Sequence, residues 1–316
     1  MIKYIFRQIL GLFATLLLVS IIIFVCFTII PGNPAELLAG VNASEEQIEI
    51  IREQLGLNQN LIYRYINWLA GALTGNFGES IQYGVPVKAL LGDRIVVTSS
   101  LAIMTLIITI VISFPLGLIS ALYQRRIADK IISTSVSIGM AMPNYLLGIV
   151  FIWICGLILH VFVPGQYCSY SDDLLLFIKG LIFPALAIAI PKICLMIKYI
   201  RNSIVEQYNA EYVKTARCNG GDKKYIILHH IMRNALIPMA TLFGMVITDT
   251  MAGSIVVEQV FGVPGVGRLL ISAINNRDFP VVMTLVVYIS LIVICINFIV
   301  ELLIKINDPR MRKKIE

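Results

Sequence analysis

Six long apolar runs constrain this sequence more than any other feature. Each has at least 20 residues, and about 20 residues at ~1.5 Å rise each let a helix cross a bilayer. The chain is 58% hydrophobic and 14% charged, whereas soluble domains have roughly 45–50% apolar and 25% charged residues. The pattern predicts an all-α polytopic membrane protein with about six transmembrane helices, not a soluble domain. The runs are residues 9–30, 95–122, 131–163, 174–200, 231–257 and 280–304.

The first and third runs differ from a simple span. The first is longer than the ~7–15-residue core of a signal peptide, and no A-x-A-like cleavage site follows it, so we expect a retained membrane anchor. The third has 33 residues, too many for one straight span, and contains Pro143 followed by Asn144. It predicts either a bend near these two residues or a strong tilt.

The distribution of basic residues predicts the orientation of the chain. Six spans place both termini on one side of the membrane, and that side holds 18 of the 25 Lys and Arg residues. Because cytoplasmic loops carry the excess of basic residues, we expect cytoplasmic N- and C-termini. The net charge of +6 is then a topology signal and a match to anionic membrane lipid. No nucleic-acid partner is needed to explain it.

A long polar connection, residues 31–94, follows the first run on the outer side. Ser44 and Gln47 form a capping-box pattern at the start of one helix. We expect a second helix over residues 61–73, where Trp68 suits the membrane–water interface. The segment is interpreted either as a small helical cap on the bundle or as a docking surface for an external partner, and the two are compatible.

A short helix is predicted within the cytoplasmic connection 201–230. It covers residues 210–219, with Asn209 as a possible N-cap and Gly220-Gly221 at its end. One interpretation is a connector on the membrane surface. The other is a helix that inserts into a groove of a cytoplasmic protein. Its narrow apolar stripe consists of Tyr212, Val213 and Ala216.

The pattern Lys214-Thr215-Ala216, followed three residues later by Gly220, resembles the EAA loop of ATP-binding-cassette importer permeases. Further matches in order along the chain resemble the dipeptide, oligopeptide and nickel branch of that family. These matches are Ile30-Pro31-Gly32-Asn33-Pro34, Gly75-Asn76-Phe77-Gly78-Glu79-Ser80, Met142-Pro143-Asn144-Tyr145, Arg233-Asn234-Ala235-Leu236-Ile237-Pro238, Glu258-Gln259-Val260-Phe261-Gly262-Val263-Pro264-Gly265-Val266-Gly267, Asn276-Arg277-Asp278-Phe279-Pro280 and Asp308-Pro309-Arg310.

The resemblance implies a type I importer permease fold in the cytoplasmic (inner) membrane, with a coupling helix that docks into an ATPase subunit. The implied partners are a second similar permease, two cytoplasmic ATP-binding subunits and an external substrate-binding protein. ATP and Mg would be bound by the ATPase subunits, and this chain would bind no cofactor. The expected organisation is 1–30 as N-terminal end and first helix, 31–94 as external helical segment, 95–304 as five-helix core with the coupling helix at about 208–221, and 305–316 as cytoplasmic tail. The implied ATPase-coupling residues are Tyr212, Lys214, Thr215, Ala216, Arg217 and Gly220.

The sequence departs from the family pattern in the coupling region. Lys214 stands where the EAA loop has its glutamate, and Gly221 stands where a leucine is common in this branch. The general I-x-L-P pattern is also absent at its usual offset. These differences concern the detail of docking.

Asp249 is the residue that most suggests a translocation pathway. It lies inside the fifth run between Thr248 and Thr250. Intramembrane carboxylates are rare and usually face a water-filled cavity or a cation. The alternatives are therefore a pathway role, meeting a peptide ammonium or a metal cation, and a structural hydrogen bond to a neighbouring helix. Lys192, in the fourth run, is expected to snorkel or to pair with a carboxylate.

The segment between the fifth and sixth runs is predicted at the outer mouth. It is interpreted either as a re-entrant element near an external gate or as a plain external turn. For one of its candidates, Glu258, a structural role is favoured. The external gate candidates are Glu258, Phe261, Pro264, Gly265 and Gly267.

No G-x-x-x-x-G-K-[ST] motif occurs, so ATP cannot bind through a P-loop of this chain. No catalytic residues and no metal site are predicted, and the chain is not expected to be an enzyme. The sequence is interpreted as the permease of a peptide importer working by alternating access. A nickel or metal-chelate permease of the same branch and, from another class, a secondary transporter are the alternatives.

Overall fold

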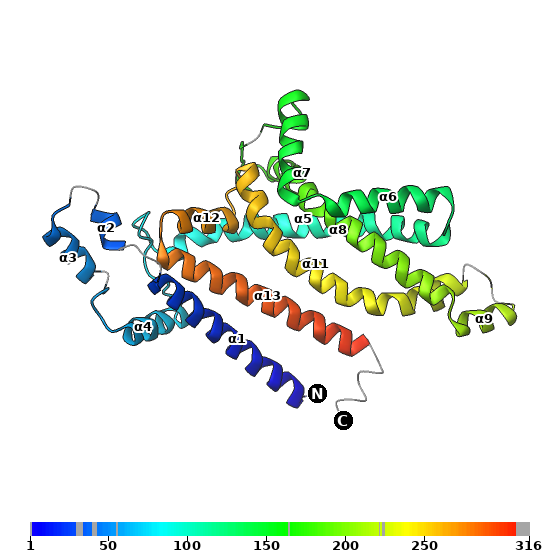
Figure 1. Ribbon diagram of the computed structural model, residues 1–316, viewed down its shortest axis with the longest axis horizontal. Helices are drawn as coiled ribbons and strands as arrows, with labels where there is room; N and C mark the ends of the chain where they lie inside the picture. Colours follow the sequence, from blue (N-terminus) through cyan, green and yellow to red (C-terminus); the bar gives the residue numbers. More distant parts are fainter. Residues whose placement is uncertain are drawn as a thin grey trace. The chain divides into compact units, whose positions relative to one another are not determined.

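The computed structural model describes residues 2–29, 34–39, 43–54, 56–163, 165–220, 222 and 225–307. Its described part is helical, with one isolated bridge between Glu79 and Pro86 (Figure 1). The exit from the first run at residues 30–33, Gly221 and the tail from residue 308 lie outside the described residues. The helices are α1 (Ile2–Ile29), α2 (Pro34–Ala39), α3 (Glu45–Gln54), α4 (Leu61–Leu73), α5 (Val87–Leu122), α6 (Ile127–Ala141), α7 (Asn144–Phe151), α8 (Leu174–Tyr208), α9 (Glu211–Cys218), α11 (Met232–Phe261), α12 (Val266–Asn275) and α13 (Phe279–Asn307), with π-helical segments η1 (Ile152–Ile158) and η2 (Ile226–Ile231).

The predicted all-α polytopic fold is confirmed. Four of the described helices are long and apolar enough to cross a membrane, and up to six spans result when each of two bent helix pairs counts as one. The third apolar run is one of these pairs, because α6 and α7 meet at an angle of 98°. The break lies at Met142-Pro143, which confirms the predicted bend over the alternative of a tilted straight helix.

The chain divides into two compact units. One comprises residues 1–98 and 264–295, and the other comprises residues 99–263 and 296–316. The division runs through α5 and α13, so each of these helices contributes to both units.

In the first unit, local sequence signals define the helices of the segment predicted to be external. The predicted capping box is present, because Ser44 N–H donates to Gln47 Oε1 at 3.1 Å and Gln47 N–H donates to Ser44 Oγ at 3.3 Å. The predicted second helix is α4, with the same bounds, and Asn60 caps it by accepting from Ile62 N–H at 3.0 Å. Tyr65 attaches α4 to α1 through a 2.7 Å hydrogen bond to Ser20.

A buried carboxylate organises the loop that precedes α5. Asp278 is fully buried and accepts a hydrogen bond from Ser80 Oγ. It also accepts from the backbone N–H groups of Ile81 at 3.1 Å and Gln82 at 3.2 Å. Because a buried charge without such donors is costly, this carboxylate keeps the turn at residues 80–83 against the start of α13.

In the second unit, α8 is the central helix and packs against α6, α7 and α11. Its middle is buried on most sides, at Ala185, Ile188, Met196 and Ile200 among others. Glycines allow its neighbours to approach closely. A Cβ atom on Gly117 of α5 would lie 2.6 Å from Ile200 Cγ2, closer than real side chains pack.

This close approach predicts different effects for two glycine substitutions. Gly117→Ala should destabilise the chain by about 1–3 kcal/mol, because an added methyl group forces Ile200 out of place. Gly180→Ala on α8 is the control, since nothing lies within 4 Å of its Cβ position and alanine favours a helix by roughly 0.5–1 kcal/mol. Thermal unfolding in detergent measures both, and equal midpoints for the two variants would contradict this packing.

Candidate coupling helix and intramembrane charge cluster

The predicted cytoplasmic helix is α9, and its N-terminus differs from the expectation. The N-cap is Ala210, without a side-chain hydrogen bond. The prediction of Asn209 as N-cap is wrong, because Asn209 ends α8, where its backbone N–H bonds the last carbonyls and its side chain donates to Val205 O at 3.0 Å. Gly220, with φ of 78°, follows the helix in the left-handed conformation that glycine adopts readily.

One face of α9 packs onto the rest of the second unit. Val213 is fully buried in a cluster formed by residues of α5, α8, η2 and α11, and Ala216 packs against the same cluster. The aromatic residues at the edge are also engaged. Tyr212 OH donates to Gln207 Oε1 at 2.8 Å, and the guanidinium of Arg217 lies over the Tyr208 ring at 4.1 Å. The apolar stripe predicted from the sequence is therefore largely used within the chain.

The opposite face of α9 is polar and exposed. Lys214 Nζ donates to Glu211 Oε1 at 2.8 Å, and both side chains are exposed. Thr215 and Cys218 are exposed on the same short helix. A partner that contacts α9 would thus meet charged and small polar side chains.

An ion pair links the middle of α8 to the middle of α11. Lys192 Nζ donates to Asp249 Oδ2, as one of the predicted alternatives for Lys192 requires. The Lys192 side chain is 4% exposed and that of Asp249 is 73% exposed. The pair therefore combines a buried cation with a carboxylate that lies on the surface of this chain.

The break between α6 and α7 lies beside this pair. A Cβ atom on Gly253 would be 2.9 Å from Asn144 Nδ2 and 3.9 Å from Lys192 Nζ. Asn144 is the first residue of α7, directly after Pro143. The absence of a side chain at residue 253 is therefore what lets the helix break approach the charged group.

The threonines on either side of Asp249 point to other partners. Thr248 Oγ1 donates to Asn297 Oδ1 at 3.1 Å. Thr250 is fully buried and donates to Val246 O at 2.6 Å. Of the three predicted pathway candidates, Asp249 is the one whose side chain is mostly exposed.

The external gate candidates fall in two parts of the structure. Glu258 and Phe261 are buried at the end of α11, and Phe261 lies 6.1 Å from the Phe162 ring. Pro264, Gly265 and Gly267 belong to the other unit, where Gly265 is the N-cap of α12. The first N–H of α12, on Val266, donates to Thr98 Oγ1 at 2.8 Å.

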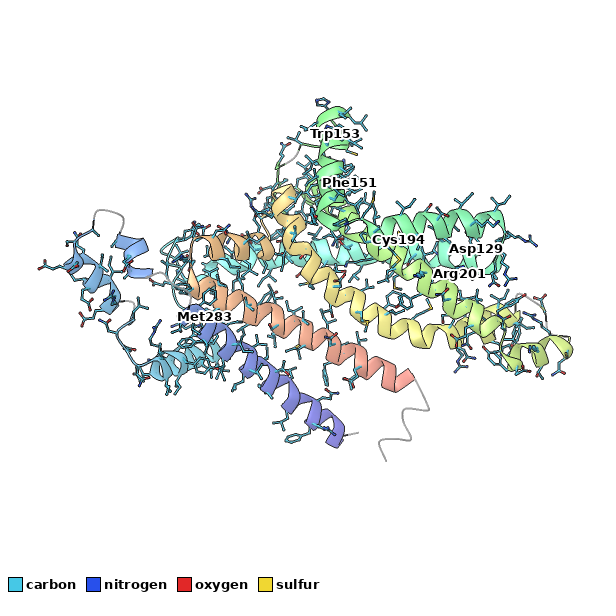
Figure 2. All side chains as sticks on the ribbon, viewed as in Figure 1. Asp129, Phe151, Trp153, Cys194, Arg201 and Met283 are labelled. Carbon is cyan, nitrogen blue, oxygen red and sulfur yellow. The ribbon has the colours of Figure 1, made fainter. Side chains whose placement is uncertain are left out.

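A buried acidic residue near the turn between α5 and α6 was missed by the sequence reasoning. Asp129 accepts two hydrogen bonds from Arg201 of α8, Nε to Oδ1 at 2.7 Å and Nη2 to Oδ2 at 2.8 Å (Figure 2). Ser120 Oγ at 2.6 Å, Arg125 N–H at 2.8 Å and Ser133 Oγ at 3.3 Å also donate to Asp129. An acid at the edge of an apolar run was the available signal, but its partner is 72 residues away.

No group of three or more His, Cys, Asp or Glu side chains that could hold a metal ion occurs among the described residues. His229, one of the adjacent histidines before α11, instead stacks on the Tyr225 ring with a centroid distance of 4.3 Å.

Comparison with known families identifies the class of protein. The model of the binding-protein-dependent transport system inner membrane component matches residues 113–313. The model of the N-terminal part of such membrane components matches residues 1–102. The chain belongs to this family of transport-system membrane components, and the resemblance predicted from its motifs is confirmed.

Individual relatives match over nearly the whole length. The probable peptide ABC transporter permease protein y4tP of Sinorhizobium fredii is 33% identical over 309 residues, covering 98% of this chain and 99% of the relative. The glutathione transport system permease protein GsiC of Escherichia coli K12 is 32% identical over 314 residues, covering 99% of this chain and all of the relative. GsiC of Shigella flexneri shows the same identity and coverage.

The Asp129–Arg201 pair predicts a measurable coupling. Arg201→Gln should lower the free energy of unfolding by about 3 kcal/mol, because it leaves a buried carboxylate without its cation. Adding Asp129→Asn to Arg201→Gln should recover part of this loss. Thermal unfolding of the two single variants and the double variant in detergent gives the coupling energy.

Arg52→Gln on α3 is the matched control, because the Arg52–Glu49 pair is exposed and should contribute about 0–1 kcal/mol. Additive losses in the Arg201 and Asp129 cycle would show that the pair contributes nothing specific.

Proposed function

We propose that this chain is the membrane-spanning permease subunit of an ATP-binding-cassette importer that translocates peptides by alternating access. The observation that carries the proposal is the full-length match to permeases named for peptide and glutathione transport. The nickel alternative is not favoured, since none of the relatives reported above is named for a metal. A secondary transporter is also disfavoured, because the family serves binding-protein-dependent systems.

In the proposed complex this chain contacts four kinds of partner. A second permease would complete the membrane part, two cytoplasmic subunits would bind ATP and Mg, and an external binding protein would deliver substrate. Membrane lipid surrounds the rest. The basic residues concentrated on one side support cytoplasmic termini and a cytoplasmic position for α9.

The packing of α9 supports its role as the coupling helix. Val213 and Ala216 belong to the apolar cluster that η2 shares with α8 and α11, and α9 packs on η2, which continues directly into α11. A force applied to α9 would therefore be transmitted to α11 through η2, and to α8 through the contacts of Tyr212 and Arg217. These are also the helices that carry Lys192 and Asp249. ATP binding could thus shift the equilibrium between two arrangements of the intramembrane ion pair. Coupling between distant sites requires such a shift. The proposed coupling residues are Tyr212, Lys214, Thr215, Ala216, Arg217 and Gly220.

Asp249 is proposed to face the translocation pathway. Its carboxylate is mostly exposed while its Lys192 partner is buried. A peptide ammonium could therefore compete with Lys192 for the same oxygen atoms. Thr248 and Thr250 would position α11 around it. The proposed external gate consists of Glu258, Phe261, Pro264, Gly265 and Gly267.

Coupling can be tested at Gly220. Gly220→Val should reduce peptide uptake at least about tenfold without reducing membrane insertion, since a β-branched residue at positive φ is strained by about 1–2 kcal/mol and alters the end of α9. Uptake of a radiolabelled peptide and the amount of chain in the membrane are measured together.

Gly84→Val is the matched control for backbone strain, because Gly84 has φ of 61° and, like Gly220, nothing within 4 Å of its Cβ position. Uptake by Gly220→Val equal to that of the parent chain would exclude α9 as the coupling helix. Co-purification of an ATPase subunit tests the complex itself, and transport by the reconstituted chain alone would contradict it.

Asp249 can be tested with and without its partner. Asp249→Asn should reduce uptake or change the range of peptides, and it also leaves Lys192 without a counterion. The double variant Asp249→Asn with Lys192→Met removes that second effect. Membrane levels should recover in the double variant while uptake stays low. Recovery of uptake with the parent's peptide range would assign Asp249 a purely structural role.

A further inference from the structure

A cavity of about 260 Å³ lies in the first unit, between the end of α1, the helix α4 and the start of α13. Its walls are mainly apolar, with Phe24 of α1 on one side and Met283 of α13 on another, the latter labelled in Figure 2. Gln59 and Asn67 also line it and are exposed. The cavity therefore has an apolar interior and a polar, exposed part.

Two hydrogen-bond donors in this cavity have no acceptor among the described residues. The indole Nε1 of Trp68 is buried and makes no hydrogen bond there. The half-buried guanidinium of Arg64 has no acidic partner in the same part of the chain, and it lies over the Phe24 ring, 6.0 Å from the ring centroid. A buried donor without an acceptor, such as Trp68 Nε1, is rare and indicates a missing partner.

The surroundings show what that partner must supply. Burial lowers the pKa of the Arg64 guanidinium, so its charged form is poorly solvated by this chain alone. The carboxylate of Asp278, next in the chain to the cavity residue Phe279, already accepts from Ser80 and two backbone N–H groups. An added group should therefore bring negative charge and acceptor oxygens.

The exposed surfaces beside the cavity favour a lipid as the source of these oxygens. Along α1, large apolar side chains such as Leu18, Ile22 and Val25 are exposed. On α4, Ile62 and Ile66 are exposed as well. A transmembrane helix and an amphipathic helix with exposed apolar faces belong to the bilayer and its interface, where phospholipid phosphates are abundant.

We propose that this cavity binds a phospholipid, with its phosphate accepting hydrogen bonds from Arg64 and Trp68 and an acyl chain lying along Phe24 and Met283. The arrangement satisfies both donors and fills the apolar wall with hydrocarbon. Arginine is suited to this role because its planar donors match phosphate oxygens in pairs. The site is separate from the coupling and translocation residues proposed above.

Tryptophan fluorescence provides a direct test. The chain has two tryptophans, so Trp153→Phe leaves Trp68 as the only tryptophan of the full-length purified chain, and excitation at the red edge of the tryptophan band avoids the tyrosines. Phosphatidylglycerol with brominated acyl chains, titrated into detergent, should quench Trp68 in a saturable manner. Arg64→Gln in the same background should raise the half-quenching concentration at least about tenfold, as loss of a charged hydrogen bond implies.

The controls separate the lipid from other sources of the same chemistry. Arg52→Gln, on the same external segment but paired with Glu49, should leave the quenching curve unchanged. Inorganic phosphate at millimolar concentration should not displace the lipid. If phosphate alone displaces it, the site is one for a free anion and the proposal is wrong.

Two further outcomes would also overturn the proposal. One is an unchanged quenching curve in Arg64→Gln. The other is protection of Trp68 from quenching by the brominated lipid when the second permease or the binding protein is added, and only then. That result would assign the missing acceptor to a protein. Should Arg64→Gln fail to fold, Trp68→Phe with native mass spectrometry replaces it. Loss of bound phosphatidylglycerol is expected in that variant, and full retention would contradict the site.

Discussion

Two ion pairs made by α8 are the interactions on which the second unit depends. Lys192 binds Asp249 of α11, and Arg201 binds Asp129 of α6. Charges placed among apolar helices are tolerated only when they are paired and hydrogen-bonded. The central helix is thereby held to a neighbour on two sides by contacts that are directional, in contrast to the apolar packing around them. In the Lys192 pair the carboxylate of Asp249 is exposed, whereas in the Arg201 pair the carboxylate of Asp129 is buried. A solute or partner could therefore contact Asp249 but not Asp129.

The parts of the fold that the sequence predicted well are those with local causes. The capping box at Ser44 and the bounds of α4 follow from residues within one or two helical turns of each other. The bend after Met142 follows from one proline that removes a backbone donor within an apolar run too long for one span. The family could also be predicted from the sequence, since its motifs occur in order along the whole chain.

The features that could not be predicted depend on contacts between distant residues. Asp129 and Arg201 are 72 positions apart, and nothing near either residue indicates the other. Asparagine is a residue type that often forms an N-cap, but the Asn209 side chain instead donates to the Val205 carbonyl at the end of α8. For α9 the apolar stripe was visible in the sequence. Its burial in the cluster shared with η2, which leaves the polar face exposed, required the packing to be known.

The helix break at Met142-Pro143 has a consequence for the water content of the bundle. An interrupted helix leaves carbonyl groups without intrahelical donors, and hydrocarbon offers none. The side of the bundle that contains this break, with Lys192 and Asn144 next to Gly253, therefore cannot be surrounded by lipid tails. It must be hydrated or covered by another protein surface. In the pathway proposed at Asp249, a solute would exchange its own hydration shell for the backbone and side-chain oxygens of the break, which would lower the dehydration barrier that a bilayer opposes to polar molecules.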